Sequence, residues 1–173
     1  PELALGRDMD QGDFHHLSVL DHQVETVAQA DRFLVDFAEF VEPLREPLTT
    51  YCAVPLVEGR PRHALIKFAG LFHDVGKPLK KTVEPDGEIW FLGHEHAGAE
   101  LMPPILERLR FATRESKMVT QLVRHHLRPG FLARGLSFPP VSVMWQWLDY
   151  FCPCFCSSIK VFISGRFSSS SKP

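Results

Sequence analysis

Apolar residues recur at three- and four-residue steps from residue 17 to residue 41, a spacing that places them on one face of an α-helix. Pro43 follows this run, so we predict an amphipathic helix over residues 17–41 that ends before the proline. A second run, residues 64–75, is more continuously apolar. It predicts a buried central helix that is ended by Gly76 and Pro78.

Two further helices are predicted downstream. One begins near His94 and runs to about residue 110, and Pro103 and Pro104 are expected to disturb or divide it. The next begins after Thr113, a good N-cap residue with Glu115 close behind, and ends at residue 126 or 127 before a proline.

The connections between these helices are rich in proline and glycine. Residues 46–61 contain three prolines and one glycine, which predicts a loop. The segment "VEPDGEIWFLGH", residues 83–94, suits a small hairpin or an excursion around Asp86-Gly87. Alternation of apolar and polar residues is not sustained anywhere, so we predict an all-α domain.

The composition of the chain changes toward its end. No acidic residue follows Asp149, and the final "SGRFSSSSKP" is a low-complexity segment without a periodic apolar face. We therefore expect a folded domain over residues 14–134, a lead-in segment over residues 1–13, and a divergent, poorly ordered tail over residues 135–173. Within the tail, residues 139–150 could form a short apolar helix.

Composition limits the classes of function. The chain has 173 residues, of which 45% are hydrophobic and 23% charged, as expected for one globular domain. Its formal net charge of −2 excludes a strongly basic nucleic-acid scaffold but leaves a local basic patch open. There is no apolar run long enough to span a membrane and no basic-then-apolar leader, so we expect a cytoplasmic protein without a membrane partner.

The cysteines raise one alternative. Cys52 stands alone, whereas Cys152, Cys154 and Cys156 alternate in "CPCFC". Three cysteines could bind a soft metal, but zinc sites usually separate paired cysteines by two or more residues and need a fourth ligand. We interpret these residues as apolar thiols in an irregular tail.

The candidate chemistry begins at "FHDVGK", residues 72–77, where His73 and Asp74 end the buried run. Burying such a pair without a partner is costly, which favours a bound group. The other predicted helices also carry histidines, namely His22, His94, His125 and His126. Helical bundles build metal sites from side chains of different helices, and imidazole with carboxylate suits manganese, nickel, cobalt, iron or zinc.

The number of ions stays open at this point. Adjacent helical residues point about 100° apart, so His73 and Asp74 reach one ion only if it lies over their shared edge. An arrangement in which Asp74 bridges two ions fits equally well. Taken singly, each histidine is more often a surface residue or a satisfied core residue than a ligand.

Five motifs in the right order carry a resemblance to a known family. They are "PEL" at residues 1–3, "HHLSVLDH" at 15–22, "FHDVGK" at 72–77, "FLGHEHAGAE" at 91–100 and "VRHHLRP" at 123–129. This pattern resembles the HD superfamily of metal-dependent phosphohydrolases. It is most similar to the HD domain that follows the catalytic domain in bacterial tRNA nucleotidyltransferases and poly(A) polymerase-like proteins. The resemblance implies a helical bundle with a metal site in its core.

The resemblance also assigns roles to individual residues. His22 matches the first metal ligand, and His73 with Asp74 match the paired ligands. Two further residues, His94 and His126, match the histidines that hold a second ion in binuclear members. His94 is chosen over His96 because it follows glycine, and His126 over His125 because it precedes leucine-arginine-proline.

Further residues are expected to serve catalysis. Asp74 and Lys77 are the expected catalytic residues, and Lys77 matches the lysine of the HD motif and would contact phosphate. Arg124 and Arg128 flank the histidine pair and could offer guanidinium groups to a phosphate. The alternative for Lys77 is a solvated lysine at a helix end, and the alternative for the two arginines is a solvated basic helix face. His96 or His125 could give a proton to the leaving oxygen.

One motif departs from the family pattern. Such domains close their metal site with an aspartate on a late helix, in a leucine-alanine-aspartate context. Here the pattern is lost near Arg134, and Asp149 in "WQWLDYF" lacks that context. The sequence therefore predicts an incomplete site.

Two functions remain. The first is a metal-dependent phosphohydrolase, a phosphodiesterase or phosphatase that acts on nucleotides or RNA-end phosphates. The second is a non-catalytic tRNA-binding or structural HD segment of a tRNA nucleotidyltransferase. Nucleotide addition itself needs a glycine-rich turn before paired aspartates, and Asp8-Met9-Asp10 lacks that turn. The expected partners are a nucleotide or phosphoester substrate and, as a candidate, tRNA.

Overall fold

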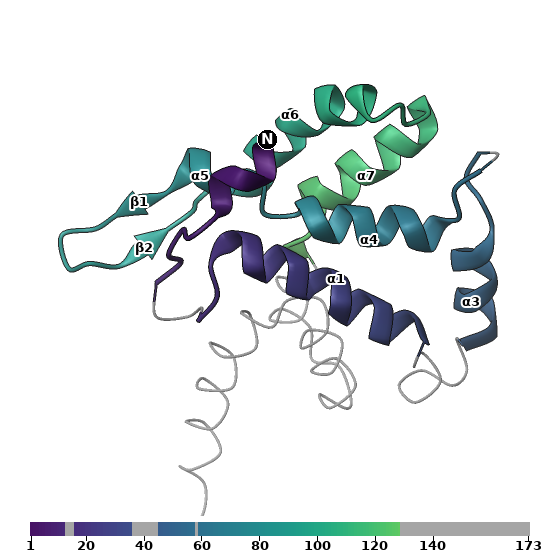
Figure 1. The fold of residues 1–173 in the computed structure, drawn as a ribbon, viewed down its shortest axis with the longest axis horizontal. Helices are drawn as coiled ribbons and strands as arrows, with labels where there is room; N and C mark the ends of the chain where they lie inside the picture. Colours follow the sequence, from purple (N-terminus) through teal and green to yellow (C-terminus); the bar gives the residue numbers. More distant parts are fainter. Residues whose placement is uncertain (13–15, 36–44, 58, 129–173) are drawn as a thin grey trace, which may run out of the picture.

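The computed structural model describes residues 1–12, 16–35, 45–57 and 59–128 (Figure 1). Two expectations, the poorly ordered tail and a short helix at residues 139–150, lie outside the described residues, and so do Asp149 and the three clustered cysteines. The prediction of an all-α domain is confirmed, since the secondary structure of these described residues is helical apart from one two-stranded sheet. No helix in the described ranges combines the length and apolarity needed to cross a bilayer.

The described residues form helices and one short hairpin. In order they are the 3₁₀-helix η1 (Glu2–Gly6), α1 (Val19–Val35), α3 (Arg45–Ala53), α4 (Arg62–Phe72), α5 (Lys77–Lys80), β1 (Thr82–Val83), β2 (Ile89–Trp90), α6 (His94–Arg108) and α7 (Thr113–His125).

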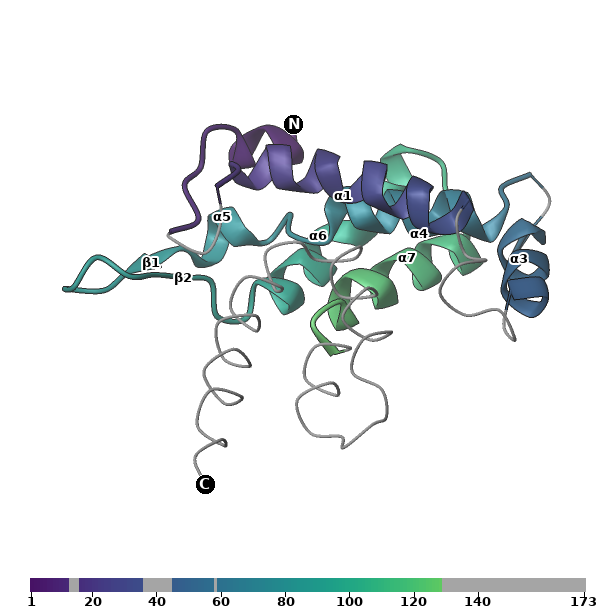
Figure 2. The same cartoon turned by 90° about the horizontal axis from the view of Figure 1, so that it is seen from below.

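Helix α4 lies at the centre of the bundle. It packs against α1 and α7, and α7 also packs against α6 (Figures 1 and 2). A helix with neighbours on several sides needs apolar residues around most of its circumference, which explains the nearly continuous apolar run of α4. The core consists of buried side chains from α4, the turn after it, α6 and α7: Leu65, Ala69, Phe72, Val75, Met102, Ile105, Leu106, Val119 and Val123. Full burial of one such large side chain is worth about 1.5–3 kcal/mol.

The predicted loop over residues 46–61 is wrong, because α3 occupies Arg45–Ala53. Prolines misled the prediction. Pro47 lies in the first turn of α3, where backbone N–H groups have no hydrogen-bond partner within the helix, so the missing N–H of proline costs nothing. Pro55 follows the end of α3, and Pro61 is the N-cap residue of α4.

Other boundaries also differ from the prediction. Helix α4 ends at Phe72, and a tight turn precedes the four-residue helix α5, so Lys77 begins a new helix. The N-cap of α7 is Ala112, because Thr113 is already the first residue of the helix. The Glu115 carboxylate accepts the Ala112 N–H at 2.9 Å. Helix α1 begins two residues later than predicted, and the residues predicted to continue it after Val35 lie outside the described part of the chain.

The two prolines of α6 do not divide the helix. Pro103 and Pro104 lie inside one helix that runs from His94 to Arg108. Met102 on one side and Ile105 on the other are almost fully buried in the core. We attribute the continuity to this packing, which offsets the hydrogen bonds that proline cannot make.

The hairpin around Asp86-Gly87 is present. Strands β1 and β2 pair antiparallel, with Thr82 opposite Trp90 and Val83 opposite Ile89. Gly87 has a φ of 92°, a conformation that glycine adopts without strain. The strands are too short to change the fold class.

The lead-in residues pack against the helices. Helix η1 contacts α1 and α5. The Arg108 guanidinium donates to both carboxylate oxygens of Glu2, at 2.9 and 2.7 Å, which ties the start of the chain to the end of α6.

Candidate metal centre

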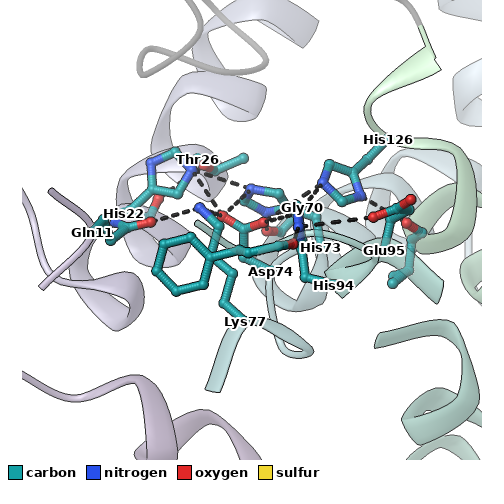
Figure 3. Close-up of polar contacts among 12 residues, drawn as sticks. Gln11, His22, Thr26, Gly70, His73, Asp74, Lys77, His94, Glu95 and His126 are labelled. Atoms are coloured by element: carbon teal, nitrogen blue, oxygen red, sulfur yellow. Dashed lines mark hydrogen bonds and ion pairs between the residues drawn. The ribbon is translucent and has the colours of Figure 1, made fainter. Parts of the chain in front are cut away.

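Four imidazoles and one carboxylate converge where the helices meet (Figure 3). His22 comes from the first turns of α1, and His73 with Asp74 from the turn after α4. His94 is the first residue of α6, and His126 directly follows α7. Segments far apart in the sequence thus supply the side chains, as the distribution of histidines predicted.

Glycine at position 76 lets the turn after α4 lie against α6. A Cβ atom on Gly76 would overlap the carbonyl oxygen of His94 and lie 2.5 Å from the nitrogen of Gly98. Only a residue without a side chain permits this approach. Gly76 therefore positions the turn that carries His73 and Asp74 beside His94.

Each carboxylate oxygen of Asp74 faces one pair of histidines. Oδ2 lies 3.1 Å from His73 Nε2 and 3.5 Å from His22 Nε2. Oδ1 lies 3.1 Å from His94 Nε2 and 3.6 Å from His126 Nε2. Within each group of three residues the ligand atoms lie within 4.8 Å of one another, so Asp74 is shared by two candidate ion sites.

Backbone carbonyls fix the tautomer of three of these rings. The Nδ1 atoms of His73, His94 and His126 each lie 2.7 Å from the carbonyl oxygen three residues earlier. A carbonyl oxygen only accepts hydrogen bonds, so each Nδ1 carries the hydrogen and a neutral ring has its lone pair on Nε2. Protein metal sites orient their ligating histidines in this way.

The electrostatics keep these groups in the form that binds cations. Burial alone would raise the pKa of the Asp74 carboxyl, but the neighbouring His73, Lys77 and His94 side chains hold it well below its usual range. Burial, with the neighbouring His73, lowers the pKa of His126 to about 4. At neutral pH the centre therefore offers an ionised carboxylate and a neutral His126.

The donor set fits a divalent transition metal. The Nε2 atoms of His94 and His126 lie 3.2 Å apart, and those of His22 and His73 lie 3.1 Å apart. In the His94–His126 pair, the two Nε2 lone pairs lie close to each other and to Asp74 Oδ1. A cation bound between these three atoms would remove their mutual repulsion. Imidazole nitrogen with carboxylate oxygen is a typical donor set for such ions.

Lys77 and Gln11 adjoin Asp74. Lys77 is buried, and its ammonium lies 2.7 Å from Asp74 Oδ2 and donates to Gln11 Oε1 at 2.6 Å. It also lies 5.2 Å from the centre of the Phe91 ring. Gln11 was not among the predicted site residues, because it lies in the lead-in segment and nothing in its local sequence pattern marks it.

The remaining predicted residues lie nearer the solvent. Arg124 and Arg128 are exposed at the end of α7 and just beyond it, and His125 is exposed as well. The side chain of His96 is 58% exposed, and its Nδ1 lies 2.9 Å from Glu95 Oε1. The structure thus brings His94 and His126 into the cluster and leaves their histidine neighbours outside it.

The chain is similar to several known proteins. The HD domain family model matches residues 19–152. The chain is 35% identical over 129 residues to an A-adding tRNA nucleotidyltransferase of Deinococcus radiodurans, covering 73% of this chain and 24% of the relative. It is 35% identical over 128 residues to a CC-adding tRNA nucleotidyltransferase of Thermus thermophilus, with the same two coverages.

A third relative matches over a shorter stretch. A multifunctional CCA protein of Nitrosomonas eutropha is 39% identical over 79 residues, 45% of this chain and 18% of that protein. The chain spans about a quarter of the length of the first two relatives, whose matches cover 24% of each. The family match covers most of the chain and includes His22, His73, Asp74, His94 and His126, so the chain belongs to the HD domain family.

Proposed function

We propose that the chain is a metal-dependent phosphohydrolase that cleaves phosphoesters of nucleotides or of RNA ends. One observation carries the proposal: the two oxygens of the buried Asp74 each face a pair of histidine Nε2 atoms. Phosphoester hydrolysis is the chemistry to which such a centre is suited, because two cations held by a shared carboxylate clamp the attacking and leaving oxygens of a phosphoryl group.

Five residues would hold the cation or cations. His22 and His73 would bind one with Asp74 Oδ2, and His94 and His126 would bind the other with Asp74 Oδ1. A bound manganese, nickel, cobalt, iron or zinc ion would supply Lewis acidity toward a phosphoryl oxygen and activate water. The protein's own contribution is to present a fixed carboxylate and four oriented imidazoles in a buried site.

Other residues would serve the substrate. Lys77 keeps a positive charge beside Asp74, where it would balance the charge of a bound phosphate. Arg124 and Arg128, both exposed, would contact phosphate oxygens. His96 or His125 would give a proton to the leaving sugar oxygen. The Nδ1 atom of His96 lies 2.9 Å from Glu95 Oε1, a contact that would orient the ring for such a transfer.

The relatives guide the choice of substrate. Two of them are named for adding A or CC to tRNA, so we propose RNA-end phosphates, with 2′,3′-cyclic nucleotides and 2′-nucleotides as small counterparts. The same likeness supports a role in tRNA processing, and we propose the cytoplasm as its place. A non-catalytic tRNA-binding HD segment is the competing function, and the test below separates the two.

The test combines metal analysis with a phosphoester panel. The purified chain is loaded with manganese, nickel or cobalt, freed of excess metal, analysed for metal content, and assayed on bis(p-nitrophenyl) phosphate and 2′,3′-cyclic nucleotides. Asp74→Asn is expected to lose both metal and hydrolysis. The matched control is Asp86→Asn, which removes an exposed carboxylate from the hairpin and can still accept the Glu88 N–H.

Each result has a clear meaning. Full metal content in Asp74→Asn would show that the centre lies elsewhere. Metal that is retained by the unaltered chain without hydrolysis of any substrate would favour the non-catalytic function.

A further inference from the structure

The two oxygens of Asp74 have unequal surroundings. Oδ1 faces the Nε2 atoms of His94 and His126. Oδ2 faces those of His22 and His73 and also lies 2.7 Å from the Lys77 ammonium. We call the first group, with Oδ1, the His94–His126 half of the centre and the second, with Oδ2, the His22–His73 half. Among the residues that the structure describes, only the second half has an ammonium at hydrogen-bond distance from its carboxylate oxygen.

Lys77 is held in this position from the other side. Its ammonium donates to Gln11 Oε1 at 2.6 Å. The Gln11 side chain is in turn fixed, because its Nε2 donates to the Leu17 carbonyl at 3.0 Å. Gln11 and Lys77, whose contact Figure 3 shows, are only 2% and 5% exposed. Hydrogen bonds buried in this way are stronger than hydrogen bonds in water.

A cation in the His22–His73 half would compete with this ammonium. Both would occupy lone pairs of the same oxygen, and two positive charges a few ångströms apart repel strongly in a buried site. Moving Lys77 away would leave the buried Gln11 Oε1 without this donor, which adds a further cost. The His94–His126 half lies on the far oxygen of the carboxylate, where the repulsion is weaker.

We propose that Gln11 is a positioning residue that holds Lys77 on Asp74 Oδ2, so that the two halves of the centre bind cations unequally. The first divalent cation enters the His94–His126 half, and the His22–His73 half binds a second cation at least tenfold more weakly. This inference rests on the proposed metal centre but not on the proposed hydrolysis.

Calorimetric titration of the metal-free chain with manganese or cobalt tests the order of binding. The unaltered chain is expected to show one tight event and a second event at least tenfold weaker. His22→Asn should keep the tight event, because it spares the His94–His126 half. His126→Asn should lose it. The reverse pattern, or two equal events in the unaltered chain, would overturn the inference.

The role of Lys77 is tested in the His126→Asn background, where only the His22–His73 half remains. Lys77→Met should strengthen that site at least tenfold, and Gln11→Met should shift it in the same direction by less. The matched control is Lys80→Met, which removes an exposed ammonium from the same short helix and should leave the affinity unchanged. Circular dichroism of every variant checks that its helical content is intact.

The outcomes separate the two proposals. Equal effects of Lys77→Met and Lys80→Met would overturn the inference while leaving the metal centre in place. Absence of binding in every protein, including the unaltered chain, would overturn the metal centre and this inference with it. Failure to hydrolyse any phosphoester, with both binding events intact, would contradict only the proposed hydrolysis.

Discussion

The Nε2 atoms of His94 and His126 lie 3.2 Å apart, although the Nδ1 atom of each ring already faces a backbone carbonyl oxygen. A neutral imidazole has one N–H hydrogen, and in each ring it lies on Nδ1 and is donated to the carbonyl oxygen. Neither Nε2 atom can therefore donate a hydrogen bond to the other. The pair is therefore arranged to accept a shared cation, and burial disfavours the simplest one, a proton, since the pKa of His126 is lowered to about 4. A metal ion meets the same need without protonating a ring.

Metal binding should stabilise the folded chain. An ion that binds only the native state adds about 2.7 kcal/mol to the free energy of unfolding when its free concentration is 100 times its dissociation constant. We expect thermal unfolding to shift to higher temperature with added manganese or cobalt and to return on chelation. Asp74→Asn should abolish the shift and Asp86→Asn should preserve it. An equal shift in Asp74→Asn would mean that the metal acts at another place.

Gly76→Ala should destabilise the fold. The added methyl group would overlap the His94 carbonyl oxygen and crowd the Gly98 nitrogen, and both are backbone atoms that cannot rotate away. Overpacking of this kind typically costs about 1–3 kcal/mol, measured here by urea unfolding. Because the turn must move away from α6, metal affinity should fall as well.

The control for this substitution is Gly70→Ala. A Cβ atom at Gly70, within α4, would lie 3.4 Å from Thr26 Cγ2, an ordinary contact. Alanine is the better helix former by about 0.5–1 kcal/mol, so this variant should be neutral or more stable. If the two alanine variants unfolded alike, close packing of the turn against α6 would not be the reason for glycine at position 76.

The sequence predicted the helices whose apolar faces repeat regularly. Helices α4, α6 and α7 were recognised because their buried residues follow the helical period. Helix α3 was missed, since the prolines around it are local signals for a loop and their positions at helix ends cannot be known beforehand. The continuity of α6 through Pro103 and Pro104 depends on packing against distant residues, which a local pattern does not contain.

The candidate site was predictable to a similar degree. Motif spacing singled out His22, His73, Asp74, His94 and His126, and the structure brings these five together. Gln11 could not be found in this way, because its contact with Lys77 joins residues 66 positions apart. Likewise, no pattern in "FHDVGK" indicates that Lys77 turns back onto the oxygen of Asp74 that faces His22 and His73.

Asp149→Asn should leave metal content unchanged. Asp149 lies outside the described residues, and the expectation rests on its sequence context, "WQWLDYF", which lacks the leucine-alanine-aspartate context of the closing ligand. Metal analysis after loading with manganese or cobalt measures the effect, and Asp74→Asn is the positive control. Loss of metal in Asp149→Asn would show that this aspartate completes the centre despite its context.

Stability in acid should depend on Glu2. A hydrogen bond from the Arg108 side chain, helped by the backbone, lowers the pKa of Glu2 from its ordinary 4.5 to about 2. The unfolded chain thus takes up the proton more readily than the folded chain, so this contribution to stability is complete above pH 4.5 and is lost as the pH falls toward 2. Glu2→Gln should therefore unfold more easily than the unaltered chain at pH 6, by the small amount expected of an exposed ion pair. The difference between the two proteins in urea unfolding should shrink at pH 3 and below. A difference that stayed constant from pH 6 to pH 2.5 would mean that Glu2 stabilises the chain by packing, without its charge.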